Sequence, residues 1–185
     1  MAEGGIEQNV SVQENTLRFE QTFLPYLDAA YNLARWLTRS VPDAEDLVQE
    51  AYLRAFEHYD SFRGQSARAW LLTIVRNACY SHLRRAIPTA DASEFDETLH
   101  VPERGTAEDP ESLTLREADR QQLTNALKEL PEEFREVIVL RELEDMSYKE
   151  MAVVLGVPIG TVMSRLNRGR DRLRGILVAA TKESH

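Results

Sequence analysis

One acidic, proline-containing stretch divides this chain into two parts that share the same apolar periodicity. Residues 86–112, AIPTADASEFDETLHVPERGTAEDPES, hold three prolines and clustered acids without a sustained repeat, which is typical of a flexible connector. On either side, apolar residues recur at intervals of three and four, and no alternating run or tight hairpin turn indicates a strand. We therefore expect an all-α protein of two small helical domains, 18–88 and 116–180, with an N-terminal tail, 1–17, and a flexible acidic linker, 89–115.

The formal net charge of −9 is unevenly distributed along the chain. Residues 1–17 carry −3 and residues 89–115 carry −7, whereas residues 18–88 carry +1 and residues 116–185 are neutral in sum. A polyanion is steered by a local basic face rather than by the total, so nucleic acid is not excluded as a partner. No apolar run approaches the roughly 20 residues that span a bilayer, and the polar N-terminus lacks a signal pattern. We expect a cytoplasmic protein without membrane insertion.

The residues that usually carry catalysis or bind metals form no such pattern here. Cys79 is the only cysteine, so it can form no disulfide within the chain, and we expect it to be a small buried hydrophobe. No phosphate-binding glycine loop occurs, and no metal-ligand spacing links the four histidines, His58, His82, His100 and His185. Neither catalysis nor a cofactor or metal is expected.

Two helices are expected in the first domain. Ser40 precedes Asp43 by three residues, the spacing of an N-terminal cap, and Pro42 suits a first helical turn. The apolar face of this helix, predicted to be core, comprises Ala44, Leu47, Val48, Ala51, Ala55 and Phe56, and its free polar face includes Asp46, Gln49, Glu50 and Arg54. A second helix over 67–85 has the apolar stripe Ala67, Leu71, Ile74 and Ala78, and a mixed stripe of Thr73, Asn77, Tyr80 and Arg84.

The second domain has the outline of a helix-turn-helix. A helix breaks at Pro131, and the next one is expected to bury Phe134, Val137, Ile138 and residues 140–143. Ser147 stands three residues before Glu150, which predicts a capping box for a short helix. Gly156 can adopt the positive φ of a tight turn, and Pro158 suits the start of another helix.

That last helix contains SRLNRGRDRLR, in which five arginines and one aspartate occupy residues 165–174. Helical spacing places Ile159, Val162, Leu166, Gly169 and Leu173 on one arc, which is expected to pack on the preceding helices. The opposite arc holds Gly160, Thr161, Ser164, Asn167 and Arg168, bordered by Arg165 and Arg172 on one side and by Met163, Arg170 and Arg174 on the other.

A run of arginines is by itself most often a solvated helix face. Here the run follows a correctly spaced turn, has few acids to pair with, and begins with Gly160 and Thr161, where a recognition helix comes closest to DNA. Serine, asparagine and arginine can bond to base edges in the major groove, while flanking arginines neutralise phosphates. The pattern indicates a DNA-reading helix.

Three segments resemble the bacterial sigma factors of the extracytoplasmic-function (ECF) type, over about residues 18–177. They are DAEDLVQEAYLRAF from Asp43, AWLLTIVRNACYSHLRR from Ala69, and LPEEFREVIVLRELEDMSYKEMAVVLGVPIGTVMSRLNRGRDRLR from Leu130. The order and spacing of the three motifs make the resemblance specific, whereas any one motif alone would not. It implies a sigma region 2 helical bundle and a sigma region 4 helix-turn-helix, association with core RNA polymerase, and promoter recognition.

The resemblance also implies roles for particular residues. The helix with Asp43, Asp46, Gln49, Glu50 and Arg54 would dock on the clamp helices of the polymerase, and the aliphatic surface of the second domain on its flap. The melted minus-10 element would be read by Arg76, Asn77, Tyr80 and Arg84, whereas Trp70 is expected to be core. The double-stranded minus-35 element would be contacted by Gly160, Thr161, Met163, Ser164, Arg165, Asn167, Arg168 and Arg172. Family members are commonly held inactive by an anti-sigma factor and respond to stress, so we expect such a partner here.

Two departures from the family and two other classes of protein bear on this interpretation. Met163 stands where many relatives carry Lys or Arg, and Ser81 where many carry Asp, which affects the expected promoter sequence rather than the function. A stand-alone helix-turn-helix regulator would explain only the second half of the chain. An enzyme with a helical DNA-binding tail would need a positioned catalytic group that the sequence does not offer.

Overall fold

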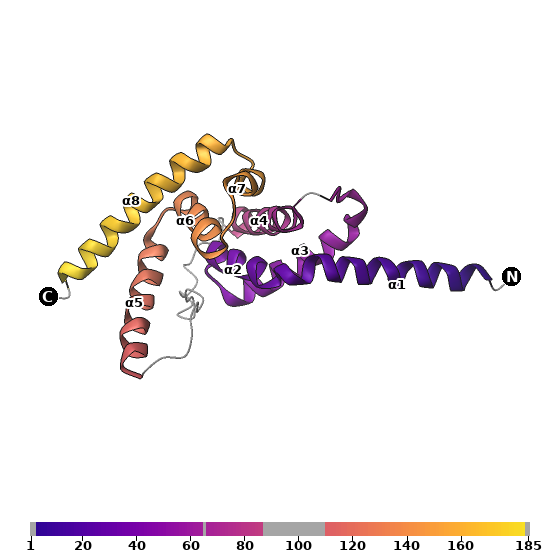
Figure 1. The fold of residues 1–185 in the computed structure, drawn as a ribbon, viewed down its shortest axis with the longest axis horizontal. Coiled ribbons are helices and arrows are strands. Elements are labelled where there is room, and N and C mark those ends of the chain that lie inside the picture. Colours follow the sequence, from indigo (N-terminus) through magenta and orange to yellow (C-terminus); the bar gives the residue numbers. More distant parts are fainter. Residues whose placement is uncertain (1–2, 65, 87–109, 184–185) are drawn as a thin grey trace.

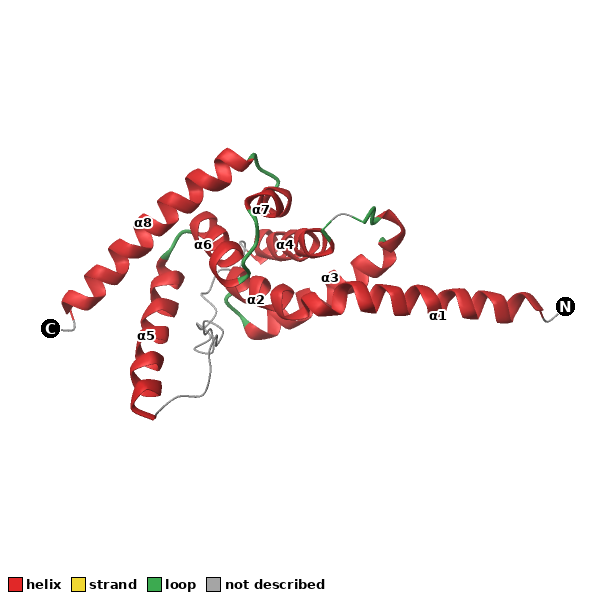
Figure 2. Ribbon diagram, in the orientation of Figure 1, coloured by secondary structure: helices red, strands yellow, loops and turns green. Residues whose placement is uncertain are grey.

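The computed structural model of this chain describes residues 3–64, 66–86 and 110–183, and every regular element in these ranges is a helix (Figures 1 and 2). The all-α prediction is confirmed. In chain order the longer helices are α1 (Glu3–Phe23), α2 (Leu27–Thr38), α3 (Val41–Glu57), α4 (Ala67–Ala86), α5 (Pro110–Glu129), α6 (Glu132–Ile138), α7 (Tyr148–Leu155) and α8 (Ile159–Glu183). Short helical turns lie at η1 (Leu24–Tyr26) and η2 (Tyr59–Ser61), and η4 (Val139–Leu143) is a π-helix.

Helices α2, α3 and α4 pack against one another as a bundle. Together with α1, this bundle is called the N-terminal half (residues 3–86). Ser40 caps α3 as predicted, since its hydroxyl accepts a hydrogen bond from the Asp43 amide at 3.3 Å. The predicted apolar face of α3 is buried with one exception: Phe56 is 41% exposed. Phe56 lies in the last turn of α3, and its ring meets that of Phe19 edge-on at 5.2 Å.

Helix α1 extends well beyond the rest of the N-terminal half (Figure 1). Residues 3–17, expected to be a tail, belong to this helix, whose C-terminal end is anchored in a cluster of aromatic rings. The Phe23 ring lies 5.2 Å from that of Trp70 and 5.4 Å from that of Phe62. Trp70 is thus partly buried against the core, as expected from the sequence, and Cys79 is fully buried.

Helices α5 to α8 form the C-terminal half (residues 110–183). The capping box of α7 is present, because Ser147 and Glu150 each bind the other's backbone amide. Gly156 ends α7 with a φ of 64°, the left-handed conformation predicted for the turn. In α8, Val162, Leu166 and Gly169 are buried as predicted, whereas Ile159 is 41% exposed because it lies at the first residue of the helix, beyond the facing elements.

The two halves pack on each other. Helix α4 lies against α7, and α2 lies against α6, so that one continuous buried core contains residues of both halves. In Figure 1, α6 and α7 lie beside the bundle, and α8 runs along the outer side of α6. Because α4 and α2 face the C-terminal half and α6 and α7 face the N-terminal half, α3 lies on one side of the molecule and α8 on another. None of the helices described is long and apolar enough to cross a membrane.

Candidate nucleic-acid and polymerase interfaces

The outer face of α8 presents most of the predicted DNA-reading residues to solvent. Gly160, Met163, Ser164, Asn167 and Arg168 are exposed and Thr161 is partly exposed. The Ser164 hydroxyl donates to the Thr161 carbonyl at 3.0 Å within the helix, and its oxygen remains available as an acceptor. Asn167 and Arg168 make no hydrogen bond or ion pair with another described residue. This face can therefore offer hydroxyl, amide and guanidinium groups to a ligand without first breaking internal contacts.

The arginines that border this face are held by the rest of the C-terminal half. Arg165 lies 3.3 Å from the Glu133 carboxylate of α6, and Arg170 lies 2.6 Å from Glu142 of η4. The hydrogen bonds that Arg170 donates to the Glu142 carboxylate raise the pKa of Arg170 above its usual value. Such pairs orient the guanidinium groups along the sides of the helix, where phosphates of a bound duplex would lie.

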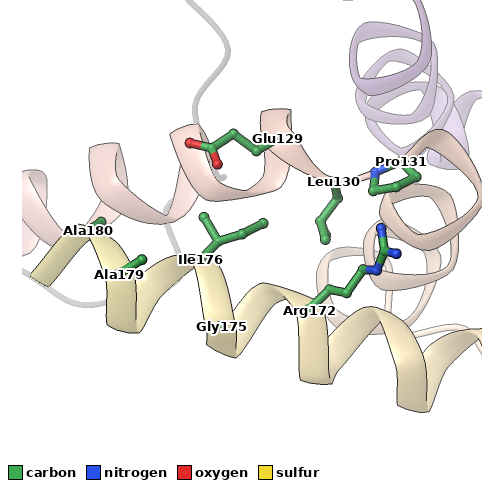
Figure 3. A pocket seen from close by; sticks show the side chains of 8 residues that line it. All are labelled: Glu129, Leu130, Pro131, Arg172, Gly175, Ile176, Ala179 and Ala180. Carbon is green, nitrogen blue, oxygen red and sulfur yellow. The ribbon is translucent and has the colours of Figure 1, made fainter.

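Arg172, which was expected to contact the minus-35 element, points away from the exposed reading face of α8 and toward α6. Its guanidinium lies over the Phe134 ring, 5.3 Å from the centroid. It lines a groove of about 470 Å³ between α5 and α8, together with Leu130 and Ile176 (Figure 3). Of the predicted minus-35 residues, Arg172 is thus the one that the structure separates from the common face.

The predicted minus-10 residues of α4 are divided between solvent and the other half of the molecule. Asn77 and Arg84 are exposed, and Arg84 donates to the Tyr80 carbonyl of its own helix at 3.2 Å. Arg76 and Tyr80 instead face α6, where Arg76 binds the Glu136 carboxylate at 2.6 Å and Tyr80 donates to it at 3.4 Å. The Arg76 guanidinium also stacks 4.5 Å from the centroid of the Tyr80 ring.

Burial and the contacts among Glu136, Arg76 and Tyr80 together shift the pKa of each side chain. The Glu136 side chain is 1% exposed, and its burial raises its pKa, which the hydrogen bonds from Arg76 and Tyr80 oppose. Burial works to lower the pKa of Arg76, but the Glu136 carboxylate outweighs it and raises that pKa. Burial and the Glu136 charge raise the pKa of Tyr80, so its phenol stays a neutral donor.

The predicted polymerase-docking face lies on α3 and is largely free. Asp46 and Gln49 are exposed. Glu50 and Arg54 form an ion pair with each other one turn apart, and Asp43 lies 3.7 Å from His82 of α4. No element of the C-terminal half packs extensively on α3, so this face can meet a partner while the two halves remain together.

Sequence reasoning missed the residues that join the halves. Glu136 and Glu144 of the C-terminal half are buried, and Glu144 binds Arg68 of α4 at 2.7 Å and Asn32 of α2 at 3.1 Å. Arg135 is 2% exposed and donates to backbone carbonyls of Trp36, Leu127 and Leu130. The available signal was the presence of charged residues inside the apolar run FREVIVLREL. Among the described residues, no cluster of His, Cys, Asp or Glu is arranged to hold a metal ion.

Comparison with known proteins agrees with this arrangement. Residues 22–87 match the family Sigma-70 region 2, and residues 120–173 match Sigma-70, region 4. The ECF RNA polymerase sigma-E factor of Escherichia coli (strain K12) is 37% identical over 152 residues, which are 77% of this chain and 79% of that protein. The chain belongs to the ECF sigma factors. As such it binds core RNA polymerase and directs promoter-specific initiation of transcription, and a stand-alone regulator is not favoured.

Two solved structures share the fold. The sigma factor RpoE in complex with the anti-sigma factor NepR from Bartonella quintana aligns with a TM-score of 0.70 and 33% identity, covering 86% of this chain and 96% of that one. CnrH in complex with the cytosolic domain of CnrY aligns with a TM-score of 0.61 and 26% identity, covering 87% and 88%. Both were solved with a partner bound, RpoE with the anti-sigma factor NepR and CnrH with the cytosolic domain of CnrY.

Proposed function

We propose that this ECF sigma factor reads the minus-35 element with α8, reads the melted minus-10 element with α4, and docks on the polymerase clamp with α3. The observation that carries the proposal is the exposed face of α8, on which Ser164, Asn167 and Arg168 lie together. Asn167 and Arg168 have no internal partner among the described residues, and the Ser164 hydroxyl, which donates to the Thr161 carbonyl, can still accept a hydrogen bond. An α-helix fits the major groove, and these three side chains have the donors and acceptors that base edges require. The proposal gives the protein a binding role and no catalytic step.

At the minus-10 element, Asn77 and Arg84 of α4 are accessible and chemically suited to an extruded base and a phosphate. Arg76 and Tyr80 would add a guanidinium and a ring for stacking once they are released from Glu136. On the polymerase side, the exposed Asp46 and Gln49 of α3 would contact the clamp. The groove between α5 and α8, with Leu130 and Ile176 beside Glu129 and Arg172 on its walls, offers a seat for the flap (Figure 3).

An anti-sigma factor is proposed as the regulator of this protein. Support comes from the solved structures. RpoE was solved with the anti-sigma factor NepR, and CnrH was solved with the cytosolic domain of CnrY. Exposed apolar side chains that a partner could cover occur on this chain, among them Leu53, Leu24 and Val153. A response to stress is the accompanying expectation.

The assignment of the two DNA elements is tested by promoter selection. Core polymerase with this protein would transcribe a library randomised at both elements, and the sequences of productive promoters would be compared between variants. Arg168→Ala should relax the preference in the upstream element only, with a loss of about 1–3 kcal/mol in discrimination. Asn77→Ala should relax the downstream element only.

Arg174→Ala is the matched control for the upstream element. It removes an arginine from the same helix, 75% exposed at its side chain and paired with Asp171, but outside the proposed reading face. Its selected promoters should equal those of the wild type. Unchanged upstream selection by Arg168→Ala would refute the role of α8.

A further inference from the structure

Met163 is the only large apolar side chain among the residues of α8 assigned to the minus-35 element. It is 47% exposed, whereas Val162 and Leu166, on the packed side of the same helix, are 0% and 1% exposed. The buried arc of α8 therefore does not include Met163. Packing within the C-terminal half does not account for an apolar residue at this position, so its role is sought in what α8 binds.

The surroundings of Met163 leave room for a ligand. Helical side chains lean toward the N-terminus of their helix, so Met163 reaches over the turn that contains Ile159 and Gly160. Ile159 lies one turn earlier and is 41% exposed, and a Cβ built at Gly160 would meet nothing within 4 Å. The two apolar side chains thus lie beside an open position, at the end of the helix whose residues contact base edges in a helix-turn-helix complex.

The chemistry of methionine selects one base in the major groove. A thioether is a weak acceptor and carries no donor, so it cannot bond the groups that distinguish guanine, cytosine and adenine. Thymine alone presents an apolar group on this edge, its C5-methyl. Contact between the two removes apolar surface of both from water. At a G·C pair the same dry contact would leave the guanine acceptor or the cytosine donor without a partner, which is unfavourable.

Asn167 and Arg168 supply the polar part of the same face. Both are exposed, and their side chains suit adenine and guanine respectively. Asn167 lies four residues after Met163, which is an advance of about 6 Å along the helix axis, against a spacing of about 3.4 Å between base pairs. We therefore expect Met163 and Asn167 to contact different base pairs of one element.

We infer that Met163 determines promoter specificity by packing on the C5-methyl group of one thymine in the upstream element, with Ile159 extending the apolar contact. The inference rests on the proposed function of α8 and names one base that this helix reads. The contact involves no charge, so it contributes to sequence preference and not to the salt dependence that arginine–phosphate contacts produce.

The test replaces thymidine by deoxyuridine, which removes the methyl group and keeps the base pair. The DNA is a promoter selected by the wild-type holoenzyme, and each thymine of its upstream element, on either strand, is replaced in turn. Competition against a labelled promoter measures the affinity of holoenzymes containing the wild type, Met163→Ala or Val178→Ala. Val178 is the matched control, because it is an apolar residue of α8 that is 50% exposed and lies near the end of the helix.

The wild-type holoenzyme should lose affinity about fourfold at one thymine, the change that corresponds to one methyl group withdrawn from its contact. Met163→Ala should bind the thymine promoter at least about fourfold more weakly and should not distinguish thymine from uracil at that position. Val178→Ala should keep the wild-type ratio. Because each result is a ratio of two affinities of one holoenzyme, an effect of a variant on holoenzyme assembly cancels.

Two further variants separate a methyl contact from a general loss of binding. Met163→Leu keeps an apolar side chain of similar size and should keep the sensitivity to uracil. Met163→Arg should change the preferred base at that position from thymine to guanine in the promoter selection, because a guanidinium donates to O6 and N7 of guanine. Circular dichroism verifies that every variant keeps its helical content.

Two results would overturn the inference. Wild-type affinity that is unchanged by uracil at every thymine of the upstream element would show that no methyl group is read. An equal thymine-to-uracil ratio in the wild type and Met163→Ala would assign the methyl contact to another residue. In both cases Arg168→Ala would still relax the upstream preference if α8 reads this element, so a failure of the proposed function is recognised by an unchanged preference in Arg168→Ala.

Discussion

Arg135 shows how one residue can connect elements that are distant in the sequence. Its guanidinium donates to Leu127 and Leu130 at the end of α5 and to Trp36 near the end of α2. These carbonyls lie at or just beyond helix C-termini and carry the negative end of the helix dipole, so a buried cation is well placed there. Burial lowers the pKa of Arg135 to about 10, and the side chain stays charged at neutral pH.

We predict that Arg135→Lys destabilises the protein by about 1–3 kcal/mol, because an ammonium cannot reach all three carbonyls and leaves buried acceptors unpaired. Urea unfolding followed by circular dichroism would measure the loss. Arg174→Lys, at a position 75% exposed, should stay within about 0.5 kcal/mol of the wild type. Equal stability of the two variants would contradict the structural role of Arg135.

At the scale of single elements, the C-terminal half follows local rules closely. Gly169 was assigned from helical spacing to the packed arc of α8, and it is buried there. A Cβ at this position would lie 3.2 Å from Ile138 Cδ1 and 3.3 Å from the Phe134 carbonyl oxygen, whereas one at Gly175 would meet nothing within 4 Å. Gly169 and Gly175 thus differ in packing although they lie on the same helix.

We expect Gly169→Ala and Gly175→Ala to have opposite effects on stability. Alanine favours a helix over glycine by up to about 1 kcal/mol, so Gly175→Ala should raise the free energy of unfolding. At Gly169 the added methyl group would push α8 from α6, at a cost of about 1–3 kcal/mol that exceeds this gain. Thermal unfolding of both variants would decide the matter, and equal shifts would disprove the close packing.

Much of each element could be predicted because its signals are local. The caps at Ser40 and Ser147 and the turn at Gly156 depend on residues within one helical turn, and all three are as predicted. Phe56 and Ile159 have the correct spacing for burial but lie at helix ends, where each remains 41% exposed. Helical spacing gives the direction of a side chain and cannot give the length of the facing element.

At the scale of the whole molecule, the packing of the two halves could not be predicted from periodicity. Glu136 and Arg76 are separated by 60 residues, and Glu144 and Arg68 by 76. Each residue alone is typical of a solvated helix face. The site residues were assigned from family resemblance and helical faces, but the division of the α4 set, with Asn77 free and Arg76 bound, depends on this long-range contact.

The free face of α3 leads to a prediction about assembly. Replacing Asp46 and Gln49 together by Arg should impair association with core polymerase and spare folding, because both side chains are exposed and the change reverses local charge. A pull-down with purified core polymerase would measure association, and circular dichroism would verify the fold. Normal holoenzyme assembly would count against this docking face.

The most direct measurement of the central claim is start-site mapping of transcripts made by core polymerase with and without the wild-type chain. We predict that the chain creates discrete start sites, each preceded by two sequence elements at a fixed separation. Transcription that begins at the same places without the chain, or start sites preceded by a single shared element, would contradict it.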